Sequence, residues 1–419
     1  MNRFFVLIVL KLILSQGALA ALPEADPAML GFDPARLALI DGAVNESISR
    51  TKLPGALVLV GRHGKIAYVK AFGHRSLIPA AEPMTRDTIF DLASLTKPLA
   101  TASSVMKLLE DGKLRLKDSL AQLLPEFDNH GKGAITLEQL LRHRAGLIAD
   151  NPISDYKDGP ELAWSRLANL DLPGTPGAAL VYSDVGFLIL GRIVERISGQ
   201  SLDQYAKASI FDPLLMRDTS FRPSENAKVA PTEPDPATGQ MLRGVVHDPR
   251  SRSTGGIAGH AGLFGTGDDL ALYAHALLSG GRGVDGTRVL SPLAVRLMTS
   301  PGSSPPGQKR GLGWDVDSPQ SGPRGELYST NGFGHTGFTG TSLWVDKETD
   351  SFVVLLTSRL HPDAKGASPT TLRNRVATLV ASAIVDLPAG SSSSSFPESH
   401  SGHPSENKGR IRAAPPRSP

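Results

Sequence analysis

The sequence predicts an α/β (α+β) fold in which one antiparallel sheet is built from both chain ends and flanked by terminal helices. Strand-like apolar runs occur at residues 56–71 and again at 340–357, whereas the residues between them have mostly helical periodicity. A sheet that joins the two ends leaves the central helices to form a second lobe. We expect a sheet lobe at about 30–90 and 310–387, and a helical lobe at about 91–309.

A helix followed by a β-hairpin is predicted near the amino-terminal end of the domain. Apolar residues recur at helical spacing across residues 34–49. Residues 56–60 and 66–71 flank the glycine-containing turn at 61–64, as expected for two strands of a β-hairpin. A helix followed by antiparallel strands therefore opens the domain.

The middle of the chain reads as helices separated by loops rich in proline and glycine. One helix is expected from Ser94 to Asp111, with Gly112 as its C-cap residue. Further helical patterns cover residues 137–142, 184–197, 201–209, 268–278 and 291–299. Strand character then returns at residues 311–316, 340–345 and 352–357, before an amphipathic helix at 372–385.

Both ends of the chain are expected to lie outside the folded domain, residues 21–387. Residues 1–20 have the features of a secretory signal peptide, because Arg3 precedes a short apolar stretch and Ala18-Leu-Ala20 offers a small-residue cleavage site. We expect cleavage after Ala20 and a periplasmic or secreted product without a stable membrane span. The tail at 388–419 contains serine and proline runs and is expected to be disordered.

Composition narrows the chemistry that the domain can carry. The chain has no cysteine, which excludes disulfides, thiol nucleophiles and thiolate metal sites. Residues 21–387 carry 38 basic and 39 acidic side chains, so the formal net charge of +3 arises at the ends and indicates no nucleic-acid partner. The eleven histidines are scattered without the spacing of a ligand cluster, and we expect no metal and no cofactor.

A serine and a lysine lie three residues apart where the helix at 94–111 is predicted to begin. This spacing puts the side chains of Ser94 and Lys97 on one helix face, and a helix start favours negative charge. The spacing alone is a weak signal, because residues 49–52 and 405–408 also match it. The alternative reading is an N-capping serine beside a surface lysine.

Several segments together resemble the serine β-lactamase and penicillin-binding-protein superfamily, especially class C β-lactamases, family VIII esterases and small DD-peptidases. Residues 90–97 resemble the nucleophile motif of the superfamily, and residues 140–147 resemble its usual helix-end segment. Residues 182–186 resemble the second motif, and residues 335–337 resemble the third motif. Residues 256–264 are a further match to penicillin-binding proteins. The resemblance spans roughly residues 35–386. His143 and His260 lie in two of these segments and are expected to hold the fold near the cleft.

The resemblance implies a β-lactamase/transpeptidase-like fold and a serine hydrolase. In this reading Ser94 attacks a carbonyl, Lys97 and Tyr182 exchange its proton, and an acyl-enzyme forms before water releases it. A serine hydroxyl needs a base within hydrogen-bond reach, and a lysine removed from water can serve. The oxyanion would lie between the backbone N–H groups of Ser94 and Phe338, the latter following the third motif on a sheet-edge strand.

The substrate-binding positions that the resemblance implies are Asp184, His335, Thr336, Gly337 and Phe338. Two of them depart from the common pattern. Many relatives have asparagine at the position of Asp184, which weakens the expectation of amide recognition. Many also have lysine at the position of His335, where it helps hold a substrate carboxylate. A mostly neutral imidazole holds an anion less well, which favours neutral esters or a different peptide.

The sequence predicts a hydrolase that transfers the acyl group of an ester or a D-amino-acid amide to water. Such an enzyme would resemble an esterase or a DD-carboxypeptidase, with weak β-lactamase activity as a side reaction. The substrates would be small esters, β-lactams or peptidoglycan-type peptides. The alternative is a non-catalytic module that keeps the fold and binds peptidoglycan or a protein, which the intact Ser94, Lys97 and Tyr182 argue against. An α/β-hydrolase would need a Gly-x-Ser-x-Gly elbow, and the chain does not contain one.

Overall fold

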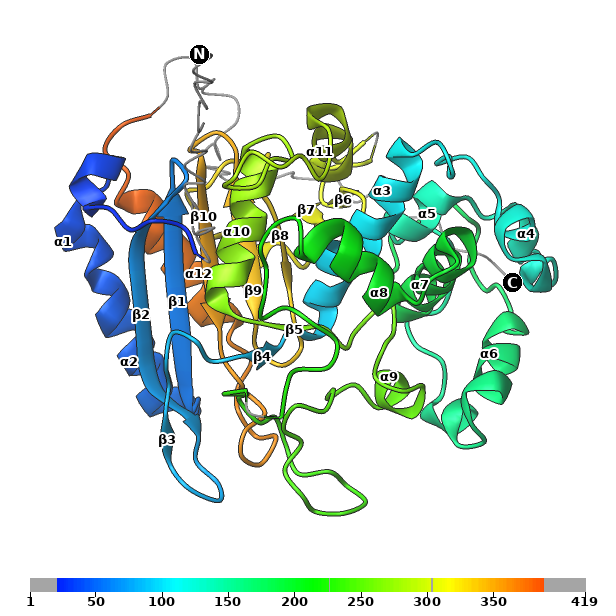
Figure 1. Ribbon diagram of the computed structural model, residues 1–419, viewed down its shortest axis with the longest axis horizontal. Coiled ribbons are helices and arrows are strands. Elements are labelled where there is room, and N and C mark those ends of the chain that lie inside the picture. The colour runs from blue at the N-terminus through cyan, green and yellow to red at the C-terminus, as the bar shows by residue number, and fades with distance from the viewer. Residues whose placement is uncertain (1–20, 226, 303, 388–419) are drawn as a thin grey trace, which may run out of the picture.

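The computed structural model describes residues 21–387 apart from 226 and 303 (Figure 1). The expected signal peptide at 1–20 and the expected tail at 388–419 lie outside the described residues. Within the described part, no helix is long and apolar enough to cross a bilayer.

The chain forms one large antiparallel sheet from its two ends, as the sequence predicts. Within the described residues the strand order is β3-β2-β1-β10-β9-β8-β7-β6. The amino-terminal strands are β1 (Gly55–Arg62), β2 (Lys65–Ser76) and β3 (Glu82–Pro83), and the carboxy-terminal strands are β6 (Lys309–Arg310), β7 (Asp315–Asp317), β8 (Phe333–Thr336), β9 (Ser342–Asp346) and β10 (Ser351–Leu356). Strands β1 and β10 join the two sets, and Val58 lies opposite Leu355.

Helices from both ends cover one face of this sheet. They are α1 (Pro34–Leu37), α2 (Leu39–Thr51) and α12 (Thr370–Ser382) (Figure 1). Successive side chains of a strand point to opposite faces, so Val58 packs with these helices while Leu57 and Leu59 face the other side. The single helix expected at 34–49 is divided into α1 and α2 at Ala38.

Helix α10 (Gly267–Leu278) covers the other face of the sheet, against β1 and β10 (Figure 1). The sequence pattern predicts these residues in the helical lobe, and the structure places them on the sheet instead. Gly267 allows the close approach, since a Cβ added there would lie 2.6 Å from Leu57 Cδ2. Most of the helix is buried because it lies between the sheet and the central helices.

The central residues form the helical lobe, which Figure 1 shows beside the sheet. Its helices are α3 (Ser103–Glu110), α4 (Leu120–Leu123), α5 (Leu137–Leu141), α6 (Pro160–Ala168), α7 (Asp184–Ser198), α8 (Leu202–Ala206), α9 (Pro249–Ser253) and α11 (Pro292–Thr299). Helix α7 is the central one, and its apolar side is buried from Val185 to Val194. A two-stranded sheet of β4 (Phe90–Asp91) and β5 (Phe264–Gly265) directly precedes the turn that contains Ser94.

The helix predicted at 94–111 is irregular at its start. A 3₁₀ turn at Ala93–Leu95 leads into a π-helical stretch at Lys97–Ala102, and only then does α3 follow. In a regular α-helix the ring of Pro98 would clash with the carbonyl of Ser94. A wider turn relieves this conflict, and such turns are frequent at functional sites.

Strand β8 carries His335 and Thr336, and it is not the edge strand that the sequence analysis expected. Strands β7 and β6 lie beyond it in the sheet. The pairing of β7 with β8 is short, with Asp315 opposite Gly334. The strand predicted at 311–316 overlaps β7 only at its end, because residues 311–314 form the turn between β6 and β7.

Candidate active site

A cavity of about 400 Å³ brings the predicted motifs together. Its lining includes Ser94, Tyr182, His335, Thr336, Gly337 and Phe338. These residues come from the start of the nucleophile helix, the segment before α7, strand β8 and the loop that follows it. Lys97 lies against Ser94, and Asp184 lies against Lys97.

Ser94 follows a strained turn. Ala93 has φ of 47°, which is uncommon for a residue with a Cβ atom. The buried carboxylate of Asp91 accepts hydrogen bonds from the backbone N–H of Ala93 at 2.9 Å and of His247 at 2.7 Å. Asp91 thereby fixes the turn that presents Ser94 to the cavity.

The Lys97 ammonium is completely buried, donates hydrogen bonds to two oxygens and forms an ion pair with a carboxylate. Its Nζ lies 3.0 Å from Ser94 Oγ, 3.0 Å from the carbonyl oxygen of His260 and 2.6 Å from Asp184 Oδ1. It also lies 5.0 Å from the ring centroid of Tyr182. Since an ammonium group has three donors and no acceptor, Lys97 donates to the Ser94 oxygen.

Asp184, expected at a substrate-binding position, is paired with Lys97 in this structure. Burial alone would lower the pKa of Lys97, but the negative charge of Asp184 and the oxygen of Tyr182 outweigh it, and the pKa is raised. Burial would raise the pKa of Asp184, but Lys97 and His260 outweigh it, and that pKa is lowered. The two groups therefore form a buried ion pair.

Tyr182 is held between the start of α7 and two histidines. Its ring stacks on His143, with centroids 4.4 Å apart and an interplanar angle of 26°, and lies 6.0 Å from His335. His143 Nδ1 accepts a hydrogen bond from the backbone N–H of Ser183 at 3.0 Å. The Ser183 side chain in turn caps α7 by accepting from the N–H of Gly186. Tyr182 and Asp184 are therefore the residues directly before and after Ser183, the N-cap residue of α7.

His335 is a neutral imidazole in the cavity wall. Burial, together with the positive charges of Arg310 and Lys97, holds its pKa well below the ordinary range. Its Nδ1 lies 2.9 Å from the carbonyl oxygen of Thr336. At neutral pH the third motif therefore supplies no positive charge to the cavity.

The loop after β8 is bound directly to the segment before Ser94. Thr339 Oγ1 donates to the carbonyl of Asp91 at 2.7 Å, and Thr341 Oγ1 donates to that of Leu92 at 3.1 Å. At Gly337 the two backbones nearly touch, since a Cβ there would lie 2.5 Å from the Leu92 oxygen. The backbone around Phe338 is thereby fixed relative to Ser94, as an oxyanion site requires.

Three further residues around Ser94 are not marked by the motifs as parts of the site. His260, expected to hold the fold, contributes its carbonyl oxygen to Lys97 and pairs with Asp248 through Nε2 at 2.9 Å. Arg373 from α12 is buried and donates to the carbonyls of Gly337 and Thr341. Arg310 from β6 lines the cavity. Neither arginine belongs to a motif, and no pattern in the sequence marks either as buried.

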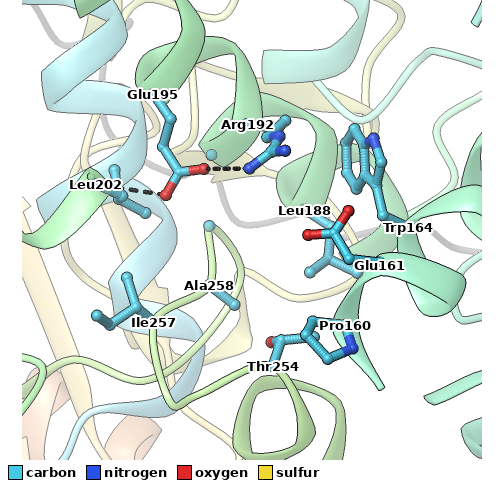
Figure 2. Close-up of a pocket in the computed structure, with 12 residues that line it drawn as sticks. Pro160, Glu161, Trp164, Leu188, Arg192, Glu195, Leu202, Thr254, Ile257 and Ala258 are labelled. Carbon is cyan, nitrogen blue, oxygen red and sulfur yellow. Dashed lines mark hydrogen bonds and ion pairs between the residues drawn. The ribbon is translucent and has the colours of Figure 1, made fainter. Parts of the chain in front are cut away.

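A second pocket, of about 190 Å³, lies along α7 (Figure 2). Figure 2 shows Glu195 bonded to Arg192 and to the backbone of Leu202, with Trp164 nearby. The pocket also touches Ala258, shortly before His260. None of its lining residues belongs to the Ser94 centre, so we locate the chemistry in the larger cavity.

Comparison with known proteins agrees with this geometry. A family model described as Beta-lactamase matches residues 40–378. A relative from Escherichia coli O157:H7 named "Putative D-alanyl-D-alanine carboxypeptidase" is 31% identical over 380 residues, covering 81% of this chain and 86% of the relative.

Solved structures show the same fold. The hydrolase EstCE1, described as having promiscuous acyltransferase activity, has a TM-score of 0.66 and 26% identity, covering 82% of this chain and 99% of that chain. A class C β-lactamase from Rhodobacter sphaeroides has a TM-score of 0.63 and 20% identity, covering 80% and 97%. The chain therefore belongs to the Beta-lactamase family, as a serine hydrolase of the β-lactamase and penicillin-binding-protein type.

Proposed function

We propose that the protein hydrolyses D-amino-acid amides and esters through an acyl-enzyme on Ser94. The observation that carries the proposal is the bonding of Lys97, whose ammonium donates to Ser94 Oγ while Asp184 and the His260 carbonyl hold it in place. Hydrolysis of an amide is also supported by the name of the relative that is 31% identical, "Putative D-alanyl-D-alanine carboxypeptidase". The ester reading is supported by the likeness to EstCE1.

The charge of Lys97 suggests how the proton moves. A lysine held as a cation stabilises negative charge on the Ser94 oxygen but has no free lone pair to take a proton. Tyr182 then relays it: as Ser94 Oγ bonds to the substrate carbonyl, the serine proton passes to the tyrosine oxygen and the phenol's own proton passes to the leaving group. In deacylation, water attacks the acyl carbon and its proton passes to the tyrosine oxygen. The phenol's own proton then returns to Ser94 Oγ.

The oxyanion formed in each step needs donors that are already in place. The backbone N–H groups of Ser94 and Phe338 are the candidates, because Thr339 and Thr341 tie their two segments together. Donors fixed before reaction require no reorganisation when the charge develops.

We also infer that the protein is exported, on the pattern of Arg3, the apolar stretch and the small residues before Ala21. Cleavage after Ala20 would release the domain at 21–387 with its carboxy-terminal extension. Expression of the full chain in a Gram-negative host, followed by amino-terminal sequencing of the periplasmic fraction, tests this inference. An uncleaved product retained in the cytoplasm would contradict it.

The hydrolase proposal is tested by mass spectrometry and kinetics on the purified protein. With a short-chain nitrophenyl ester we expect a burst of nitrophenol and an acyl mass increment on the peptide that contains Ser94. Ser94→Ala should abolish both. The matched control is Ser49→Ala, which alters an exposed serine with the same spacing to a lysine and should change neither.

Equal turnover by Ser94→Ala and the unaltered protein would end the assignment. Binding of an intact D-alanyl peptide with no covalent adduct at any pH would favour the non-catalytic module instead.

A further inference from the structure

The ring of Phe338 is an exposed aromatic surface in the wall of the Ser94 cavity. Phe338 directly follows the third motif and lines the cavity together with Ser94 and Tyr182. It is 59% exposed, whereas every other phenylalanine that the structure describes is buried. Single exposed apolar side chains are common on protein surfaces. This one differs from them because it lines the cavity that contains the proposed nucleophile.

Two neighbouring side chains hold the ring although it is exposed. The guanidinium carbon of Arg359 lies 4.3 Å from the Phe338 ring centroid, and the His247 ring stacks on it at 5.5 Å with an interplanar angle of 25°. Arg359 Nε also donates to the carbonyl oxygen of Phe338 at 2.6 Å. A cation over an aromatic face and a stacked pair of rings are both attractive. The ring therefore has a preferred orientation before any substrate binds.

His247 is itself fixed by two carboxylates. Its Nε2 lies 2.6 Å from Glu233 Oε1, and its backbone N–H donates to Asp91 Oδ2 at 2.7 Å. Asp91 is also the residue that fixes the turn leading to Ser94. The aromatic stack on Phe338 and the turn that presents the nucleophile therefore share one buried carboxylate.

A fixed and exposed ring favours one kind of contact. Its burial against an apolar group removes aromatic surface from water, and aromatic pairs contribute beyond the area that they bury. Because the ring is already oriented, little side-chain freedom is lost when such a group binds. The backbone N–H of Phe338 is the proposed oxyanion donor, so a group that touches the ring is attached close to the reacting carbonyl.

We propose that Phe338 is a specificity-determining residue, and that its ring contacts an aromatic group attached next to the scissile carbonyl of the substrate. The proposal rests on the proposed function and narrows it. Arylacetyl esters, benzyl esters and amides of aromatic D-amino acids are then preferred over the corresponding small aliphatic compounds. The aromatic group belongs to the acyl part or to the leaving group, and the chemistry of the contact is the same in both.

The first experiment compares two aryl esters with one small reference ester, ethyl acetate. Ethyl phenylacetate carries the aromatic group in its acyl part, and benzyl acetate carries it in its leaving group. Turnover is followed as acid release. We expect Phe338→Ala to lower the kcat/KM of one aryl ester relative to that of ethyl acetate by about tenfold, and the affected ester identifies the part of the substrate that meets the ring. Unchanged ratios for both aryl esters would overturn the proposal.

The ratio of kcat/KM values separates specificity from structural damage. A smaller folded fraction or a displaced oxyanion donor lowers the kcat/KM of all three esters alike and leaves their ratios unchanged. Phe338→Tyr keeps the aromatic ring and should keep the wild-type ratios. The matched control is Leu293→Ala, which removes another exposed apolar side chain, on α11 and outside the cavity lining. It should also keep the wild-type ratios.

A second experiment measures binding without turnover, in the Ser94→Ala background. Saturation-transfer NMR should show contact between the protein and the phenyl protons of one of the two aryl esters. Adding Phe338→Ala should remove that contact. Equal transfer with and without the Phe338 ring would overturn the aromatic subsite.

Failure of this inference is distinguishable from failure of the proposed function. If esters acylate Ser94 while Phe338→Ala leaves both ratios unchanged, the hydrolase stands and the aromatic subsite is wrong. If Ser94→Ala retains full ester turnover, the proposed function is wrong, and the NMR comparison still decides whether the ring binds an aromatic group.

Discussion

The ion pair between Lys97 and Asp184 determines the charge beside Ser94 Oγ in the proposed catalytic centre. An asparagine at position 184 would hydrogen-bond to the lysine but carry no charge to oppose the effect of burial. With aspartate, the nitrogen beside Ser94 Oγ is held as a cation. In the proposed mechanism, Asp184 therefore affects the proton transfer through the charge of Lys97.

Asp184→Asn is expected to move the pH dependence of the reaction. Burial lowers the pKa of Lys97, and without the carboxylate less opposes it. The alkaline limb of kcat/KM should therefore shift to lower pH, with a loss of about tenfold or more at neutral pH. The profile is measured with a nitrophenyl ester between pH 5 and pH 10. An unchanged alkaline limb would show that Asp184 does not set the charge of Lys97.

The sequence could identify the residues that belong to motifs, but not those that depend on burial. Ser94, Tyr182 and His335 were predicted from their motifs, and the structure brings all three to one cavity. Arg310 sits among ordinary charged and glycine residues, next to the half-exposed Lys309. The burial of Arg310 and the exposure of Lys309 depend on where β6 lies in the sheet. A strand of two residues is too short for the sequence to indicate that position.

At the scale of elements, the centre depends on close contact between the loop after β8 and the segment leading to Ser94. Hydrogen bonds from Thr339 and Thr341 join the two, and Gly337 leaves no room between them. The sequence predicted the strands and helices that carry these segments more reliably than their irregular ends. The π-helical start at Lys97–Ala102 was read as ordinary helix because apolar spacing does not distinguish the two.

Gly337→Ala should separate this loop from the nucleophile segment. The added methyl group would lie 2.1 Å from Thr341 Oγ1 and 2.5 Å from the Leu92 oxygen, so one backbone has to move. A displacement of this kind costs about 10²-fold in kcat when it misaligns reacting groups. Gly42→Ala on α2, where the added group meets open space, is the control and should leave kcat unchanged. Wild-type kcat in Gly337→Ala would contradict the role of this contact.

At the scale of the whole molecule, α10 links the sheet to the helical lobe and carries a buried acid at its start. Asp269 accepts hydrogen bonds from the backbone of Asp218 and from Thr219 Oγ1, and burial raises its pKa to about 7. The two-part architecture was predictable from the order of strands and helices. The placement of α10 was not, because its burial on nearly all sides gives no amphipathic pattern to follow.

Asp269 should make the stability of the domain depend on pH. Its pKa in the folded protein is above the unfolded value of 3.8, so the folded state holds a proton that the unfolded state releases. The stabilisation is complete below about pH 4 and is lost as the pH rises through 7. Between pH 5 and pH 8 the loss is about 3 kcal/mol.

Asp269→Asn keeps an acceptor oxygen and removes the titration. Urea unfolding at pH 5 and pH 8 should show a smaller pH-dependent loss in the variant than in the unaltered protein. Identical losses in the two proteins would mean that Asp269 titrates alike in the folded and unfolded chains.

The pairing of β1 with β10 joins residues almost three hundred positions apart. The segment before Ser94 is bonded to the loop between β8 and β9, so a growing polypeptide contains the proposed nucleophile long before the proposed oxyanion donor at Phe338. Distant pairings of this kind form slowly. We therefore expect the proposed site to be complete only once the carboxy-terminal strands have joined the sheet.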